Sequence, residues 1–160
     1  DAQILGIRKG EKGNPGELSG LIRYEAGNIL GEISENRKNG IFGTMEASQL
    51  KNMNLEKVPI GYKQDLKTGP ASVFCCTDGE VKEYAAEITR IDLNHEDSNK
   101  SFVIQITDKE LLEKTGGIVQ GMSGSPVLQN GKLFGAVTHV FVQDSTSGYG
   151  IFIENMMDVA

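Results

Sequence analysis

The chain has 160 residues, which is the size of a single domain. Its 16 basic and 22 acidic side chains give a net charge of -6, so it lacks the surplus of lysine and arginine that nucleic-acid phosphates require. No apolar run approaches the roughly 18–20 residues of a membrane-spanning helix. Glycine is over-represented, with 20 residues where average usage predicts about 11, and this favours short strands joined by tight turns.

Short apolar stretches separated by turn residues are expected to form strands. In chain order they cover residues 3–8, 18–24, 28–33, 40–45, 58–62, 71–76, 81–93, 101–107, 126–129, 132–141 and 148–153. Asp78-Gly79 and Asn130-Gly131 are dipeptides typical of hairpin turns and predict two antiparallel hairpins. One short helix is expected at 108–116, with Asp108 as N-cap and Gly116 as its stop, and residues 154–160 could begin another. This spacing favours an antiparallel sandwich or barrel.

The two cysteines, Cys75 and Cys76, are neighbours on a predicted strand. Successive strand side chains point to opposite faces, so this pair is a poor candidate for an ordinary disulfide. The pair also lacks metal-ligand spacing, and no metal site is predicted. The first residue is Asp1 rather than methionine, and we expect the chain to be a piece of a longer protein.

The candidate catalytic serine lies within residues 115–141. Ser123 lies between Met122 and Gly124, with Gly121 before them, and is followed by proline and a predicted hairpin. A nucleophilic serine needs an exposed hydroxyl on a tight turn, with backbone N–H groups directed at the oxyanion that its attack creates. Because glycine, serine and proline also populate ordinary loops, the motif alone leaves both interpretations open.

These residues resemble a known family. Residues 121–126, followed by the hairpin and residues 135–139, resemble the nucleophile region of chymotrypsin-like serine peptidases. Further segments resemble the stage IV sporulation protein B (SpoIVB) family of serine peptidases from endospore-forming bacteria. They are Asn-Pro-Gly-Glu at 14–17, Gly-Ile-Phe-Gly-Thr at 40–44, Lys-Thr-Gly-Pro at 67–70, Ile-Thr-Asp at 106–108, the whole run at 113–126 and Thr-Ser-Gly-Tyr-Gly at 146–150. The resemblance extends from about residue 4 to residue 157.

The resemblance assigns roles to particular residues. Ser123 matches the nucleophile and Asp108 the acid of the triad, although an aspartate there also suits a plain helix cap. Gly121 and Ser123 would supply the N–H groups of the oxyanion hole. Thr138 and His139 would face or flank the substrate. No metal or organic cofactor is implied.

The catalytic histidine of the family is expected in a Gly-His motif upstream of this chain. Neither His95 nor His139 stands in such a motif, so the chain as printed is expected to be nearly inactive. Strand alternation puts His139 on one face with Val137 and Phe141, which favours a groove or core residue over a general base. His95 lies in a charged loop typical of a solvated turn. Met122 replaces the acid that pairs with a freed N-terminus in trypsin-type enzymes, so that activation mechanism is not expected.

The resemblance implies an all-β, chymotrypsin-like double β-barrel. Residues 1–57 would form a truncated N-terminal barrel, and residues 58–160 the C-terminal barrel that carries the nucleophile. Family members are exported from the forespore into the space between its two membranes. There they process themselves and a membrane-bound regulatory protein, which leads to sigma-factor activation. The alternatives are a non-catalytic β module that binds peptide strands and a homodimer formed through exposed strand edges.

Overall fold

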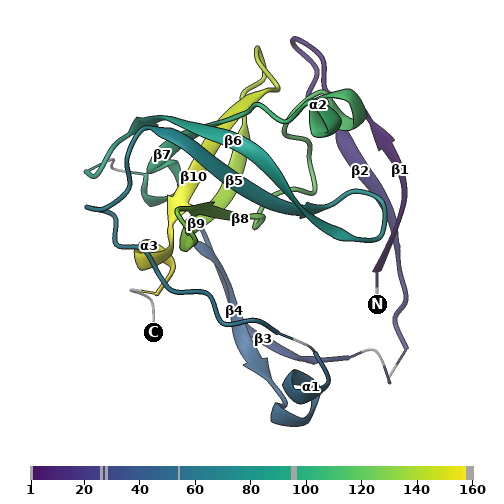
Figure 1. Cartoon of the computed structure of the whole chain (residues 1–160). Coiled ribbons are helices and arrows are strands. Elements are labelled where there is room, and N and C mark those ends of the chain that lie inside the picture. The colour runs from purple at the N-terminus through teal and green to yellow at the C-terminus, as the bar shows by residue number, and fades with distance from the viewer. Residues whose placement is uncertain (1, 26, 28, 54, 95–96, 158–160) are drawn as a thin grey trace.

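A closed antiparallel barrel forms the centre of the protein in a computed structural model that describes residues 2–25, 27, 29–53, 55–94 and 97–157 (Figure 1). Its six strands follow the order β10-β7-β6-β5-β8-β9, and β9 pairs with β10 to close it. They are β5 (Gly69–Cys76), β6 (Val81–Ile91), β7 (Phe102–Ile106), β8 (Pro126–Gln129), β9 (Lys132–Val140) and β10 (Ser147–Phe152). The predicted all-β barrel fold is confirmed.

The barrel interior is filled by alternate side chains of its strands. On β6, Tyr84, Ala86 and Ile88 are buried while their neighbours are exposed, as expected for a strand with one face toward a core. Phe102 and Ile104 of β7 extend the same core. The loop that carries Ser123 therefore leads into a packed, closed sheet.

Both predicted hairpins are confirmed. Asn130 and Gly131 have φ angles of 52° and 73°, the left-handed pair of a type I′ turn, and they connect β8 to β9. Gly79, with φ 96°, lies in the turn between β5 and β6.

The first 45 residues form two separate hairpins. β1 (Ala2–Arg8) pairs with β2 (Glu17–Ile22), and β3 (Gly31–Arg37) pairs with β4 (Gly40–Met45). Figure 1 shows β1–β2 beside the barrel near α2, and β3–β4 extending below the barrel with α1. The interpretation of residues 1–57 as part of an N-terminal barrel stays a prediction.

Two of the expected strands differ clearly from the structure. The strand expected at 58–62 is wrong, because Ile60 makes a single bridge to Leu133 and Gly61 packs against the Phe134 ring. Pro59, which cannot donate to a ladder, lies in the middle of this segment. The strand expected at 28–33 is shifted to β3, and Asn28 lies outside the described residues.

The structure has more short helices than the two expected, at 108–116 and 154–160. The predicted helix is α2 (Lys109–Thr115), ended by Gly116 in the left-handed conformation with φ 71°. Two further α-helices are described, α1 (Ala47–Asn52) and α3 (Ile153–Met157), together with the 3₁₀ turn η2 (Ser98–Lys100). Residues 158–160 of the expected C-terminal helix lie outside the described residues. Within the described ranges, no helix has the length and apolar character needed to cross a membrane.

Candidate active site

Ser123 lies on the loop that connects α2 to β8, and its side chain is exposed. Glycines on both sides of it adopt left-handed angles, with φ 101° at Gly121 and 92° at Gly124. Residues with a Cβ rarely adopt these angles, so the sharp bend requires glycine at both positions. Met122, which is 1% exposed, anchors the bend in the core.

The backbone amides around Ser123 fall into two groups. Gly124 donates to the Val137 carbonyl at 2.8 Å, and Val137 donates back to Ser125 at 3.0 Å, so the end of the loop is fastened to β9. The N–H groups of Gly121 and Ser123 have no hydrogen-bond partner in the described part of the chain. Two unpartnered amides next to an exposed hydroxyl are what an oxyanion hole requires before substrate binds.

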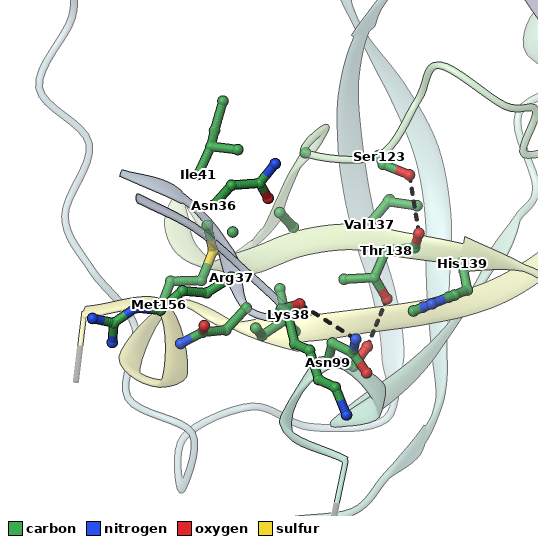
Figure 2. Close-up of a pocket in the computed structure, with 15 residues that line it drawn as sticks. Asn36, Arg37, Lys38, Ile41, Asn99, Ser123, Val137, Thr138, His139 and Met156 are labelled. Carbon is green, nitrogen blue, oxygen red and sulfur yellow. Dashed lines mark hydrogen bonds between the residues drawn. The ribbon is translucent and has the colours of Figure 1, made fainter. Parts of the chain in front are cut away.

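The Ser123 hydroxyl donates to the Thr138 carbonyl at 3.0 Å (Figure 2). Thr138 is the extra residue of a β-bulge, because Tyr149 of β10 pairs with His139 while Gly150 pairs with Val137. A bulge disrupts the ladder locally and re-aims side chains. Thr138 at the bulge and His139 next to it both line a cavity beside Ser123.

This cavity has a volume of about 450 Å³ and lies beside Ser123. One wall is formed by β9, including Thr138 and His139, and another by the turn of the β3–β4 hairpin at residues 36–41 (Figure 2). Asn99 connects the walls: its backbone carbonyl accepts from the Thr138 hydroxyl at 2.6 Å, and its side-chain amide donates to the Lys38 carbonyl at 3.4 Å. The structure thus brings Ser123, Thr138 and His139 to one cavity, and their roles stay predictions.

A protein-family model described as SpoIVB peptidase S55 matches residues 1–157. The chain belongs to the SpoIVB peptidase S55 family. It is therefore a peptidase domain, and its barrel is consistent with the chymotrypsin-like architecture of the resemblance. No match was found among curated proteins.

Asp108, the triad acid by resemblance to SpoIVB peptidases, is the N-cap of α2. One carboxylate oxygen accepts from the Leu111 N–H at 3.0 Å, and the other accepts from the Ala85 N–H at 3.3 Å. Asp108 does not occur among the described residues that line the cavity beside Ser123. These contacts support the capping interpretation, while the role of triad acid stays a prediction.

Replacing Asp108 by alanine is expected to lower the free energy of unfolding by about 1 kcal/mol, because the Leu111 N–H loses its acceptor. Asp108→Asn is expected to restore most of that loss, since asparagine caps helices as well as aspartate does. Urea unfolding followed by circular dichroism measures both variants.

The same pair of variants tests the catalytic assignment. If Asp108 acts only as a helix cap, Asp108→Asn is expected to keep most of the turnover in a histidine-bearing form of the peptidase. A fall of about 10⁴-fold in kcat would instead identify Asp108 as the triad acid.

The environment of His139 differs from the one expected. Val137 is 1% exposed whereas His139 is exposed, so the two side chains do not share a face. The bulge at Thr138 interrupts the alternation on which that expectation rested. His95 lies outside the described residues.

The two cysteines are free thiols rather than a disulfide. The pKa of Cys75 is raised to about 11, mainly by burial and to a lesser extent by the nearby Cys76, Asp108 and Asp78. Cys75 is therefore a neutral thiol near pH 7 and a poor nucleophile.

Sequence reasoning missed Asn99 and the β3–β4 turn as parts of the cavity. They come from segments far from Ser123 in the chain, and the family-like segment at 40–44 does not indicate which part of the chain the turn approaches. The one available signal was polar, turn-forming composition at residues 36–40, which predicts a turn but not its neighbour.

Proposed function

We propose that this chain is the nucleophile-bearing part of a serine endopeptidase. The Ser123 oxygen attacks the scissile carbonyl of a peptide while its proton passes to a general base. The tetrahedral oxyanion is held by the N–H groups of Gly121 and Ser123. When the intermediate collapses, the base returns the proton to the departing amine, and water then hydrolyses the acyl-serine ester. The observation that carries this proposal is a pair of amides, next to an exposed serine hydroxyl, that have no hydrogen-bond partner among the described residues.

The general base is proposed to be the histidine of the upstream Gly-His segment that the family resemblance implies. Without it, the chain keeps an oxyanion site and a substrate groove but lacks proton transfer, so we expect it to be nearly inactive. Ser123 donates to the Thr138 carbonyl, which is a resting arrangement that an imidazole would replace. His139→Ala in the histidine-bearing protein tests the alternative base. Retention of most of the turnover excludes it.

The open edge of β9 is proposed to bind the substrate backbone. Phe141 donates toward β10, to the Ser147 carbonyl at 2.9 Å, so strand alternation directs the Val140 N–H and C=O to the opposite side. The pairing of β8 with β9 extends to Ala136, and on that side residues 138–140 pair with no strand in the described part of the chain. The Thr138 carbonyl faces the same side, toward Ser123. An extended peptide can therefore add as an antiparallel strand next to the nucleophile.

Reaction with a fluorophosphonate–rhodamine probe tests the proposal directly. We expect the histidine-bearing protein to be labelled at Ser123, identified by mass spectrometry of the tryptic peptide, and Ser123→Ala to remain unlabelled. Absence of labelling in the histidine-bearing protein would favour the non-catalytic β module that binds peptide strands.

The biological role rests on the family resemblance. We propose export from the forespore to the space between its membranes, self-processing, and cleavage of a membrane-bound regulatory protein that leads to sigma-factor activation. Cleavage of that partner in reconstituted vesicles, absent with Ser123→Ala, is the expected result. Association into homodimers through strand edges predicts a concentration-dependent sedimentation coefficient, and a constant monomer value would exclude it.

A further inference from the structure

The β1–β2 hairpin is hydrogen-bonded to the loop that carries Ser123. Both the N–H and the carbonyl of one loop residue, Gln120, bond to the backbone of the hairpin. The Gln120 N–H donates to the Gly16 carbonyl at 2.8 Å, and the Leu18 N–H donates to the Gln120 carbonyl at 2.8 Å. Glu17 and Gln120 thereby form a parallel bridge. Gln120 immediately precedes Gly121, so β2 holds the peptide unit that leads into the proposed oxyanion hole.

This peptide unit couples two groups that point in opposite directions. The Gln120 carbonyl and the Gly121 N–H belong to one planar trans peptide. Because the carbonyl is directed at Leu18 of β2, the Gly121 N–H is directed away from β2, where it has no partner in the described residues. A rotation of this plane by a half turn would present the carbonyl oxygen in place of the N–H. Glycine at position 121 makes that rotation sterically permissible.

The hairpin is also seated closely enough to hold this orientation. The position of a Cβ on Gly121 would lie 3.1 Å from the Leu18 Cβ, so the Leu18 side chain covers the bend. At the far end of the loop, Gly10 donates to the Thr115 carbonyl at 2.8 Å. The contact therefore runs along the loop and is not confined to Gln120.

We propose that the Leu18 N–H selects the orientation of the Gln120–Gly121 peptide in which the Gly121 N–H faces the substrate oxyanion. The β1–β2 hairpin is then a positioning element: when docked it assembles the oxyanion hole, and when displaced it lets the peptide turn over and fill the hole with a carbonyl oxygen. This inference rests on the proposed serine-peptidase function and assigns to Leu18 and Gln120 a role that neither the sequence motif nor the family match contains. Met122 is buried and cannot form the activating ion pair of trypsin-type enzymes. The contact between Leu18 and Gln120 would take the place of that ion pair.

Leu18→Pro removes the donor while leaving the strand backbone extended. The Leu18 N–H faces Gln120 rather than β1, so proline at this position costs the hairpin no ladder bond of its own. In the histidine-bearing protein we expect the maximal rate of fluorophosphonate labelling, kinact, to fall by about 10²-fold, which is the loss typical of one oxyanion donor. The reversible affinity constant KI is expected to stay within about 2-fold, because the groove along β9 is intact.

Two controls separate this role from general damage. Leu21→Ala alters an exposed side chain of the same strand and is expected to leave both constants unchanged. Replacing the Leu18 amide by an ester through semisynthesis removes the donor without the proline ring, and it is expected to reproduce the loss in kinact. The ester decides the matter if Leu18→Pro fails to fold, as judged by circular dichroism.

The outcomes are distinguishable. A fall in kinact with KI unchanged, in either Leu18 variant, supports the positioning role. Wild-type kinact in the folded ester or proline variant overturns it while leaving the serine-peptidase proposal intact. An equal change in kinact and KI in a folded variant shows a merely structural contact and also overturns it. If the unsubstituted histidine-bearing protein is not labelled, the peptidase proposal itself fails, and this inference fails with it.

Discussion

Ser123→Ala is expected to reduce peptide hydrolysis by about 10⁶-fold in a histidine-bearing form of this peptidase, the loss typical of deleting a nucleophilic serine. The substitution removes the attacking oxygen, while the amides of Gly121 and Ser123 and the strand edge of β9 remain. Because the side chain is exposed and, among the described residues, hydrogen-bonds only to the Thr138 carbonyl, the melting temperature is expected to change little. Turnover of a fluorogenic casein substrate and a thermal unfolding curve measure the two effects.

Ser125→Ala is the matched control for this experiment. Ser125 lies two residues further along the same bend, and the hydrogen bonds that involve it run through its backbone, to Met122 and Val137. Its hydroxyl is therefore dispensable, and activity within a few-fold of the parent is expected. If Ser125→Ala abolished hydrolysis and Ser123→Ala did not, the nucleophile would have been assigned to the wrong serine.

Local turn chemistry made much of the fold predictable. Asn130-Gly131 predicts the β8–β9 hairpin because both residues tolerate the left-handed angles that the turn requires, and the structure has them there. The same reasoning at Asp108 and Gly116 predicts both ends of α2. Each of these signals acts within a few residues, which is the range over which sequence determines backbone conformation directly.

The long-range features of the candidate site could not be predicted in this way. That Gln120 pairs with Gly16 and Leu18 depends on where the β1–β2 hairpin docks, which no local pattern encodes. The bulge at Thr138 likewise depends on the register between β9 and β10, and it overrides the alternation expected for His139. Asp108 shows a different limit: an aspartate before a helix satisfies both the capping pattern and the family motif, so the residue type alone does not separate them.

Gly135→Ala is expected to destabilise the barrel by about 3 kcal/mol or more, because it forces apart the two strands that close it. Gly135 is buried in β9 opposite Phe152 of β10, and a Cβ there would lie 1.8 Å from the Ile151 carbonyl oxygen. The contact is with backbone, which cannot rotate aside as a flexible side chain could. Overpacking of a core typically costs about 1–3 kcal/mol, and each ladder hydrogen bond lost as β9 and β10 separate adds about 1 kcal/mol.

Gly6→Ala is the matched substitution for urea unfolding, because a Cβ at Gly6 of β1 meets no atom within 4 Å and its φ is not left-handed. Its free energy of unfolding is expected to stay within about 0.5 kcal/mol of the parent. The closure defect in Gly135→Ala should also reach the active site, since Thr138, whose carbonyl accepts from the Ser123 hydroxyl, lies on the same strand, between two residues that pair with β10. Fluorophosphonate labelling of Gly135→Ala at a temperature where it is still folded should therefore be slower than that of the parent. Equal free energies of unfolding for the two glycine variants would contradict the close approach of β9 and β10 at Gly135.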